Sequence, residues 1–417
     1  MNSISYALEQ IVRKQREEFL LYSSKQYYSR KKESDLREAL SSSLVKVVLG
    51  PRRAGKSRLI QKVLENKKVA YLNFEEELFQ ASSGDAVIEA ARKVYPDAEF
   101  WYLDEIQDME DWETLVNKLH RRGFNLVITG SNAKLLSSEL ATALTGRHIP
   151  IELLPFSYKE YLGAKGFDKS WNTFQDYLEK GGYPEILFES SISHKQYLKT
   201  LYDSVILKDL VKRKKIRNPG YLTNTLSIVT NNIGSRISSR ALSKALKSTP
   251  SPTTIEKYLT YLEEAYLVET LQAYSHKTKT RINSERKPYL IDTGILSALN
   301  SGSLPIMGKQ LENAVYLHLR RLQNYNDIQL FYYREEQGRE IDFLIKTAHE
   351  ITDLIQVSLN LSTMETRERE VRVLKSAHKE YPKTSLTIVT ANEPGSIKLD
   401  SKLKIDLVPV WEYCSME

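Results

Sequence analysis

One short run near the N-terminus limits what this chain can fold into more than any other feature. The pattern G-x-x-x-x-G-K-[ST] is matched by Gly50-Pro51-Arg52-Arg53-Ala54-Gly55-Lys56-Ser57, and an apolar stretch at 44–49 comes directly before it. This pattern is typical of a phosphate-binding loop that connects a buried strand to the start of a helix. The sequence therefore predicts a strand at 44–49 and a helix at 58–64.

The residues of this loop have separate expected roles in holding a nucleotide. Glycines let backbone N–H groups curl around phosphates, and the N-terminus of a helix favours negative charge. We expect Lys56 to reach the β- and γ-phosphates and the Ser57 hydroxyl to face Mg²⁺, with Arg58 at the start of the helix. ATP and Mg²⁺ are therefore the expected cofactors.

A second motif supports the first. The apolar run Phe100-Trp101-Tyr102-Leu103 ends in two adjacent carboxylates, Asp104 and Glu105. In this arrangement Asp104 is expected to hold the Mg²⁺ shell, and Glu105 is expected to orient or deprotonate the attacking water. The order of the two motifs favours nucleotide binding over a buried strand that merely ends in an acidic turn.

Composition is that of an ordinary globular protein. The chain has 417 residues, of which 41% are hydrophobic and 27% charged, and its length predicts about two to four domains. Its apolar runs are too short to span a bilayer and residues 1–13 hold no apolar signal core, so we expect no membrane partner and a cytoplasmic location. The single cysteine, Cys414, excludes an internal disulfide and a Cys-based metal site. The net charge of +7 is compatible with a nucleic-acid partner but does not require one.

Short apolar strands alternate with helices between residues 44 and 155. The strands are expected at 44–49, 69–74, 99–103, 126–129 and 149–153. This alternation predicts a parallel sheet covered on both faces. After the fourth strand, Ser131 or Asn132 is placed to sense the γ-phosphate, and an Asn-capped turn into the next helix is the alternative.

Basic residues occur at two further places of interest. Arg147 precedes the fifth strand, where it is either a solvated turn residue or an arginine that stabilises transition-state charge in its own subunit or a neighbour. After Pro155 the pattern is helical to about Lys215, and the run 208–217 is strongly basic, with Lys212 and Arg213 near its centre. Such a run is usually a solvated helix end, and nucleic-acid contact is the alternative.

Residues 237–290 have the element order of a winged helix-turn-helix. Helices are expected at 237–246 and 253–267, followed by a ribbon with strands at 268–274 and 287–291. The second helix carries several glutamates, so we do not expect it to read bases. The ribbon is the better candidate for contacting DNA phosphates, through Lys277, Lys279, Arg281, Arg286 and Lys287.

The C-terminal region is expected to form another α/β unit. Helices are predicted at 310–322 and 365–379, and strands at 330–334, 340–346, 353–358, 385–390 and 404–409.

Taken together, the motifs resemble those of AAA+ ATPases common in archaea and some bacteria. The resemblance covers roughly residues 40 to 410 and rests on five segments: Gly50–Ser57, Leu103–Gln107, Ile128–Ser131, Leu144–Arg147 and Glu152–Phe156. In this group the ATPase core is joined to a winged helix and to a C-terminal module similar to a PD-(D/E)XK nuclease. The resemblance implies an ATPase sheet with strand order 5-1-4-3-2 and a helical lid.

The resemblance also divides the chain and assigns roles. The sequence pattern itself predicts an N-terminal helical segment at 1–43. The resemblance implies an ATPase core at 44–155, a helical lid at 156–222, a winged helix at 223–290 and a nuclease-like domain at 291–417. Lys56 and Ser57 carry over as phosphate and Mg²⁺ contacts, and Asp104 and Glu105 as the metal and catalytic carboxylates. Ser131 or Asn132 falls at the sensor position, and Arg147 is a candidate finger or sensor arginine.

The C-terminal motif departs from the nuclease pattern. Such a site needs two carboxylates that bind Mg²⁺ and a lysine that assists the attacking water. Glu312 and Asp342 match the first acidic positions, but Gln356 replaces an anionic ligand and Ser358 replaces the lysine. We expect the fold to be kept and cleavage to be lost, unless Lys346 or another cation substitutes.

The leading hypothesis is an ATP hydrolase that couples its nucleotide state to movement of the lid and winged helix, with DNA as the target. ATP or ADP, DNA and further copies of the chain are the expected partners. One alternative is a nucleotide-gated scaffold that holds a protein partner. The other is an ATP-controlled, metal-dependent nuclease.

Overall fold

The structure is a computed structural model whose contacts divide the chain into two compact units. Unit 1 comprises Met1–Leu154 with Glu264–Tyr266, and unit 2 comprises Pro155–Glu263 with Leu267–Glu417. The finer boundaries expected within unit 2 remain predictions. No helix in the described part of the chain is both long and apolar enough to span a bilayer. The described residues are 3–23, 27–132, 144, 146–188, 192–247, 250–275, 277, 284–299, 306–323, 325–335, 338–401 and 403–416.

Unit 1 is built on a five-stranded sheet in which all strands are parallel. The strand order β5-β1-β4-β3-β2 confirms the order that the resemblance implied. Each strand begins and ends within one residue of its predicted bounds, because the central strands β1, β3 and β4 are buried along their whole length and read as continuous apolar runs. The strands are β1 (Val45–Leu49), β2 (Val69–Asn73), β3 (Phe100–Asp104), β4 (Leu126–Gly130) and β5 (His148–Glu152).

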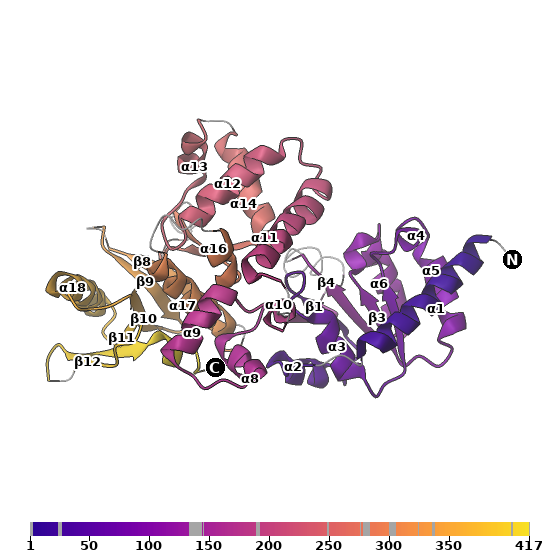
Figure 1. Ribbon diagram of the computed structural model, residues 1–417, viewed down its shortest axis with the longest axis horizontal. Helices are drawn as coiled ribbons and strands as arrows, with labels where there is room; N and C mark the ends of the chain where they lie inside the picture. Colours follow the sequence, from indigo (N-terminus) through magenta and orange to yellow (C-terminus); the bar gives the residue numbers. More distant parts are fainter. Residues whose placement is uncertain are drawn as a thin grey trace. The chain divides into compact units, whose positions relative to one another are not determined.

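Helices cover both faces of this sheet, as predicted (Figure 1). On one face α2 (Lys32–Ala39) and α3 (Lys56–Leu64) share a core with Tyr102 and Val127. On the other face α5 (Gly84–Val94) and α6 (Trp112–Arg121) form a second apolar cluster with β1 to β4. Unit 1 also contains the short helices α4 (Glu77–Gln80) and η1 (Ile106–Asp108).

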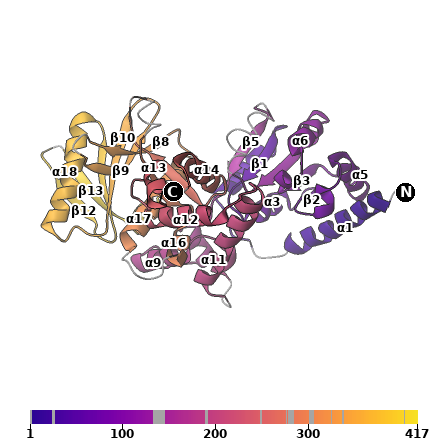
Figure 2. The same cartoon turned by 90° about the horizontal axis from the view of Figure 1, so that it is seen from above.

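Helix α1 (Ser3–Ser23) runs along the edge strand β2 (Figure 2). The Gln15 side chain donates a hydrogen bond to the carbonyl oxygen of Asn73 at 3.1 Å and accepts one from its N–H at 2.9 Å. Further along α1, the Phe19 ring stacks on Tyr71 with centroids 4.8 Å apart. Because an open strand edge offers unpaired backbone groups to other chains, α1 protects this side of the sheet.

Unit 2 begins with helices that match the helical pattern predicted after Pro155. Helix α8 starts at a capping box in which Ser157 and Glu160 each accept the other's backbone N–H, and it ends at Gly166 with φ 67°. The segment η3 is a π-helix, a form that is often found at functional sites. The elements are α8 (Tyr158–Lys165), α9 (Trp171–Lys180), α10 (Pro184–Leu187), α11 (His194–Val205), η3 (Ile206–Lys212) and α12 (Pro219–Asn231).

A buried aspartate connects helix α16 (Thr293–Leu299) to the loop after α9. Asp292 accepts hydrogen bonds from the N–H groups of Gly182 at 2.7 Å and Gly294 at 2.9 Å. Burial raises the pKa of Asp292 to about 6, even though these N–H donors favour the charged form. At neutral pH the fold therefore holds a buried negative charge at this position.

The elements predicted for the winged region are present in the expected order. Helices α13 (Ser239–Ala245) and α14 (Pro252–Glu264) precede an antiparallel hairpin of β6 (Val268–Gln272) and β7 (Arg286–Leu290). The glutamates of α14 serve internal contacts. Glu256 pairs with Arg286 at 2.7 Å, and Glu263 accepts a hydrogen bond from Thr270 at 2.5 Å. Glu256 and Glu263 therefore bind helix α14 to the β6–β7 hairpin.

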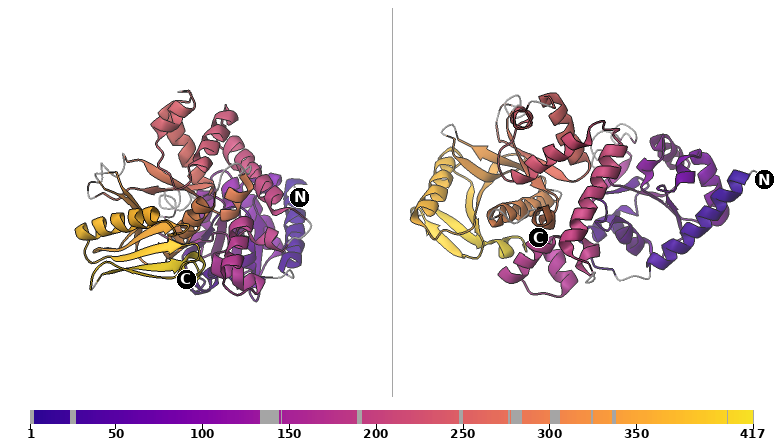
Figure 3. Two further views of the ribbon diagram at one scale, coloured as in Figure 1. Left: turned by 60° about the vertical axis from the view of Figure 1, so that its left-hand side comes forward. Right: turned by 45° about the horizontal axis from the view of Figure 1, so that its top comes forward.

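The C-terminal part of unit 2 is a six-stranded mixed sheet in the order β12-β13-β11-β10-β9-β8. Strands β10, β11 and β13 are parallel to one another, and the other pairings are antiparallel. The sheet lies between helices α17 and α18 (Figure 3). The elements are α17 (Met307–Gln323), β8 (Gln329–Arg334), β9 (Glu340–Lys346), β10 (Ile351–Ser358), α18 (Met364–Glu380), β11 (Ser385–Thr390), β12 (Gly395–Lys398), β13 (Lys404–Pro409) and α19 (Val410–Tyr413).

The α/β unit predicted for this region is confirmed. Its five predicted strands correspond to β8, β9, β10, β11 and β13, and the two predicted helices correspond to α17 and α18. Strand β12 was not predicted. Its four residues are mostly exposed, so they carry no alternation of apolar and polar side chains.

Candidate nucleotide-binding site

The phosphate loop connects β1 to α3 and depends on glycine at two points. Gly50 and Gly55 have φ values of 145° and 96°, and Arg53 also has a positive φ of 64°. At Gly50 a Cβ atom would lie 2.0 Å from the carbonyl oxygen of Leu153, so a larger residue would displace the backbone. The predicted strand, loop and helix are therefore present, and the loop is fixed against the segment that follows β5.

The ammonium group of Lys56 is enclosed by the loop. Its Nζ donates hydrogen bonds to the carbonyl oxygens of Gly50 at 3.0 Å and Pro51 at 3.1 Å. It also lies 3.5 Å from Oε1 of Glu105, and its side chain is only 5% exposed. The two predicted motifs therefore meet in space at this lysine.

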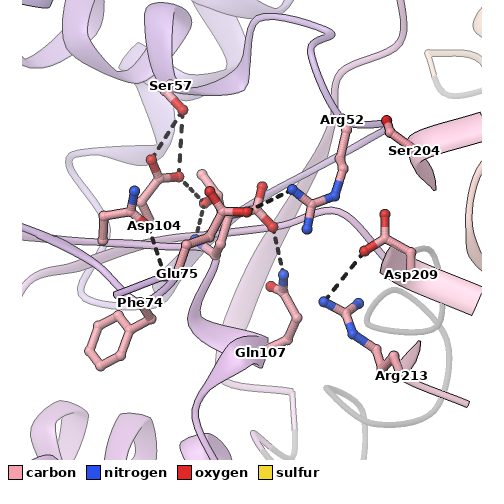
Figure 4. Close-up of polar contacts among 12 residues, drawn as sticks. Arg52, Ser57, Phe74, Glu75, Asp104, Gln107, Ser204, Asp209 and Arg213 are labelled. Atoms are coloured by element: carbon pink, nitrogen blue, oxygen red, sulfur yellow. Dashed lines mark hydrogen bonds and ion pairs between the residues drawn. The ribbon is translucent and has the colours of Figure 1, made fainter. Parts of the chain in front are cut away.

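Asp104 ends β3 beside the start of α3, so that the two predicted Mg²⁺ ligands lie together (Figure 4). The Ser57 hydroxyl donates to Asp104 Oδ2 at 3.2 Å, and the Tyr71 hydroxyl donates to the same oxygen at 3.2 Å. Burial, followed by the neighbouring charge of Glu105, raises the pKa of Asp104. A cation at this carboxylate would stabilise its charged form.

Glu105 is held in an unusual backbone conformation at the end of the same strand. Its φ of 49° and ψ of 44° are left-handed, a region that residues other than glycine seldom adopt. Gln107 donates a hydrogen bond to Glu105 Oε2 at 2.5 Å. Burial disfavours the charge, but Lys56, Arg52 and Gln107 together keep the pKa of Glu105 below its usual value. Glu105 is therefore ionised at neutral pH.

The hydroxyl of Thr129 connects the two acidic residues. It donates a hydrogen bond to Asp104 Oδ1, and it accepts one from the N–H of Glu105 at 2.8 Å. No role was predicted for Thr129 from the sequence, because its contacts depend on β4 lying beside β3. The sequence indicates only that Thr129 is a polar residue near the end of a predicted strand.

Arg30 is a second residue that sequence reasoning missed. This nearly buried side chain donates to the carbonyl oxygens of Ala54 at 2.8 Å and Leu154 at 2.6 Å. It therefore fastens the phosphate loop to the segment after β5. Nothing in the local sequence around Arg30 distinguishes it from the other basic residues of the N-terminal segment.

The residues present fit a magnesium–nucleotide complex. Mg²⁺ prefers oxygen ligands and commonly takes only one or two from protein side chains, the rest coming from substrate phosphates and water. Ser57 and Asp104 supply such oxygens at the loop. Among the described residues, no group of three or more His, Cys, Asp or Glu side chains is arranged to hold a metal ion. We therefore expect the phosphates of a bound nucleotide to supply the remaining Mg²⁺ ligands.

The remaining candidates in unit 1 lie at opposite edges of the sheet. Asn132 follows the carboxyl end of β4, the edge where Asp104 and the phosphate loop lie. Arg147 precedes the amino end of β5, and its carbonyl oxygen accepts the N–H of Val45 at the start of β1. Five strand residues at about 3.3 Å each separate the two edges by roughly 16 Å. Arg147 is therefore not placed at the loop of its own subunit.

The basic residues of the predicted wing divide into four groups. Lys277 is exposed, Arg286 is paired with Glu256, and Lys279 and Arg281 lie outside the described residues. Lys287 is 1% exposed and bound to carboxylates, so the prediction that it contacts DNA phosphates is wrong. Its place on a buried strand of the hairpin explains the error.

The second basic segment lies on and after the π-helix η3. Lys212 is exposed, whereas Arg213 is half-buried and lies 3.6 Å from the carboxylate of Asp209. Lys214 places its ammonium 5.0 Å from the centre of the Tyr261 ring. Lys212 is therefore open to solvent, whereas Arg213 and Lys214 have contacts within unit 2.

The predicted nuclease-like residues come together in unit 2. Glu312 on α17 and Asp342 on β9 both lie within 3.2 Å of the ammonium of Lys287. Gln356 Oε1 accepts the N–H of Asp342 at 3.2 Å, and the Ser358 hydroxyl donates to the carbonyl oxygen of Asn360. The cation beside the carboxylates is thus Lys287 and was not found from the sequence, because it comes from the hairpin.

Family models match consecutive parts of the chain. Residues 42–162 match a model described as an AAA domain. Residues 172–305 and 307–413 match two domains of unknown function, DUF8612 and DUF4143.

Two curated proteins are similar over most of their length. The uncharacterized protein MJ1544 of Methanocaldococcus jannaschii is 33% identical over 404 residues, which cover 91% of this chain and 90% of that protein. An uncharacterized protein of Haemophilus influenzae is 30% identical over 341 residues, which cover 77% of this chain and 84% of that protein.

Two solved structures show distant similarity. The Walker-type ATPase paby2304 of Pyrococcus abyssi has a TM-score of 0.43 at 15% identity, over 66% of this chain and 96% of that chain. AMPPCP-bound DnaA from Aquifex aeolicus has a TM-score of 0.30 at 15% identity, over 57% of this chain and 90% of that chain. Similarity at this level carries no argument about function.

The AAA-domain match spans the phosphate loop and both carboxylates whose geometry is given above. The similarity to MJ1544 extends over nearly the whole chain. The protein therefore belongs to the same family as MJ1544 and carries an AAA domain at residues 42–162.

Proposed function

We propose that this protein binds ATP with Mg²⁺ and hydrolyses it to ADP and phosphate. The observation that supports the proposal best is the meeting of two separate motifs at the carboxyl edge of one sheet. Lys56 from the loop lies 3.5 Å from Glu105, and Ser57 lies 3.2 Å from Asp104. A lysine, a hydroxyl and two carboxylates of different pKa are the groups that phosphoryl transfer to water requires.

Binding would use the loop and the start of α3. The N–H groups of the loop and of the helix N-terminus would surround the β-phosphate, and Lys56 would exchange its carbonyl partners for phosphate oxygens. Ser57 and Asp104 would hold Mg²⁺, which supplies positive charge to the phosphates when it is bound.

Hydrolysis would use Glu105. Its low pKa keeps the carboxylate ionised, so it is able to accept a hydrogen bond from the attacking water and then its proton. The hydrogen bond from Gln107 fixes the orientation of the carboxylate. Asn132, at the end of the neighbouring strand β4, is proposed to contact the γ-phosphate.

Release of phosphate from ATP tests this proposal directly. The parent protein is expected to show steady-state turnover that stops when EDTA removes Mg²⁺, and Lys56→Ala is expected to lose turnover at ordinary ATP concentrations. Turnover that persists in Lys56→Ala would reject the assignment of this site.

We also propose that nucleotide state is coupled to DNA through the helical lid and the winged helix. The exposed residues Lys212 and Lys277 favour a phosphate contact, although Arg286 and Lys287 are engaged within unit 2. Steady-state ATPase rates with and without duplex or single-stranded DNA test this coupling. Rates that do not respond to either form would favour the alternative, a nucleotide-gated scaffold for a protein partner.

The C-terminal module is proposed to be nuclease-like in fold but not in activity. Gln356 is neutral and Ser358 has no positive charge, so neither supplies what cleavage requires at these positions. Incubation of supercoiled plasmid with Mg²⁺ or Mn²⁺ tests the third function considered, a metal-dependent nuclease. Cleavage that is lost in Asp342→Asn would revive it.

A further inference from the structure

A buried lysine in unit 2 is surrounded by carboxylates. Its Nζ lies 3.2 Å from Glu312 Oε1, 2.7 Å from Glu340 Oε1 and 2.9 Å from Asp342 Oδ1. An ammonium group donates three hydrogen bonds, and the three carboxylates of Glu312, Glu340 and Asp342 use all of them. The side chain of Lys287 is 1% exposed, so no solvent replaces these partners.

The surroundings of Lys287 keep its ammonium group protonated. Burial by itself would lower the pKa of Lys287, but Asp342, Glu312 and Glu340 together raise it above its ordinary value. The ammonium therefore stays protonated over the whole physiological range. The Tyr332 ring, with its centre 5.8 Å from Nζ, adds a further favourable contact.

Each carboxylate also has a partner other than Lys287, which binds the same oxygen of Glu312 and the second oxygen of Glu340 and Asp342. The Tyr289 hydroxyl donates to Glu312 at 2.8 Å, and the N–H of Val357 donates to Asp342 Oδ2 at 3.0 Å. Nε of Arg236 lies 3.2 Å from the second oxygen of Glu340. The positions of the three acids are thus fixed by partners other than Lys287.

The loop between α12 and α13 closes the cluster. Gly234 has a φ of 70°, and a Cβ atom at this residue would lie 2.5 Å from Glu312 Oε2. The N–H of Gly234 donates to the carbonyl oxygen of Pro288, next to Lys287, at 3.1 Å. The backbone therefore approaches Glu312 as closely as glycine permits and leaves no room for a further ligand on this side.

We propose that Lys287 is the resident cation of this carboxylate site, occupying the place between Glu312 and Asp342 that a divalent metal ion would need. The site then has no affinity for Mg²⁺ or Mn²⁺ in the native protein. Its role is to bind the β6–β7 hairpin to α17 and β9, so the hairpin and the C-terminal sheet move as one body. This proposal does not depend on ATP hydrolysis in unit 1.

Lys287 would exclude a divalent metal ion because the two cations compete for the same carboxylate oxygens. A divalent ion would have to expel an ammonium that is covalently tethered, fully hydrogen-bonded and buried. Gln356 contributes a neutral amide at the position where a further anionic ligand would help the metal to compete. Removal of the lysine should therefore convert the cluster into a metal site.

The test measures Mn²⁺ binding to the full chain by EPR of the free ion. All proteins carry Asp104→Asn and no nucleotide is added, so that unit 1 contributes as little binding as possible. With Lys287 present we expect no Mn²⁺ site that depends on Asp342. The Lys287→Met variant should bind one Mn²⁺ at least about tenfold more tightly than the protein that contains Lys287. Adding Asp342→Asn to this variant should remove the gain in affinity.

Thermal unfolding provides a second readout of the same variants. Lys287→Met leaves three carboxylates without their shared cation, so its Tm should fall, and Mn²⁺ should restore part of the loss. The Tm of the protein with Lys287 should not respond to Mn²⁺. If Lys287→Met does not fold, Lys287→Met combined with Glu340→Gln has one charge fewer and keeps Glu312 and Asp342 for the titration.

Two results would overturn the proposal. One is Mn²⁺ binding to the protein that contains Lys287, provided that Asp342→Asn abolishes it, because the lysine would then not exclude the ion. The other is a folded Lys287→Met variant, single or combined with Glu340→Gln, that binds Mn²⁺ no more tightly than the protein with Lys287.

Discussion

The ammonium of Lys56 and the carboxylate of Glu105 lie 3.5 Å apart, so a cation from the phosphate loop and an anion from the end of β3 balance each other. A nucleotide phosphate would compete with Glu105 for this lysine. Binding of ATP would then also free Glu105 to face a water molecule. The two residues are expected to respond differently to substitution, because one holds the phosphates and the other acts in the reaction.

Lys56→Ala should weaken ATP binding, because it removes a cation from the phosphates. Glu105→Gln should keep binding and slow turnover, since it spares Asp104 and Ser57. Titration with a fluorescent ATP analogue and the steady-state rate separate the two effects. An equal loss of affinity in both variants would contradict these roles.

Thr129→Val should impair turnover although Thr129 is not expected to touch the nucleotide. Valine has nearly the same shape but cannot donate to Asp104 or accept from the N–H of Glu105. Loss of hydrogen bonds to charged groups costs about 1.5–3 kcal/mol, which corresponds to roughly a ten- to hundredfold lower rate. The Mg²⁺ concentration needed for half-maximal activity should also rise.

Thr129→Ser is the matched control for this variant, because it keeps the hydroxyl. It should retain most of the activity and the Mg²⁺ dependence of the parent. Similar losses in the serine and valine variants would point to packing of the methyl group instead of the hydrogen bonds.

Arg147→Ala should reduce ATP hydrolysis only through contacts between subunits, because Arg147 lies at the amino edge of its own sheet. A finger arginine typically matters by about 10³-fold or more, so a change smaller than about twofold would exclude this role. Mixing Arg147→Ala with Glu105→Gln protein should restore part of the activity, since each variant supplies what the other lacks. Mixtures as inactive as the separate variants would exclude action across an interface.

Asp292 should make the stability of the protein depend on pH. Its pKa is raised from 3.8 to about 6 in the folded state, so its contribution is fully present below about pH 4 and is lost as the pH rises through 6. The shift corresponds to about 3 kcal/mol between these limits. Urea unfolding at pH 4.5 and 7.5 should show the parent losing stability relative to Asp292→Asn. A difference between the two proteins that does not change with pH would contradict the assignment.

Charge reversal at Lys212 and Lys277 should weaken binding to all DNA duplexes alike. If these residues contact phosphates, each lost contact should reduce the slope of log affinity against log salt by about one. Lys14→Glu with Lys383→Glu is the control of equal charge, because both side chains are at least 78% exposed and lie outside the basic segments. Equal effects of the two pairs in a mobility-shift titration would indicate that only net charge matters.

Much of the fold could be predicted because its signals are local. The strands of the ATPase sheet are continuous apolar runs, and the phosphate loop is specified by eight adjacent residues. The missed features depend on distant parts of the chain. Thr129 acquires its role only because β4 pairs with β3, and Lys287 meets Asp342 although 55 residues separate them.

The position of Arg147 shows another reason why a site residue could not be placed from the sequence. Its place in the sequence, before the fifth strand, was read correctly, but its relation to the nucleotide depends on the direction of β5. Because β5 is parallel to β1, the residue before it lies at the edge opposite the loop that follows β1. The strand order and the parallel pairing together give this result, whereas a motif considered by itself does not.

The covering of β2 by α1 bears on how the AAA domain can be isolated. The matching family model begins at residue 42, so a fragment cut at that point would lack α1 and the pair of hydrogen bonds between Gln15 and Asn73. Such a fragment would present a bare strand on which another copy could add its own, and would tend to aggregate. A fragment that keeps the whole of α1 over β2 therefore has to start at or before Ser3, and not at residue 42, where the matched AAA domain begins.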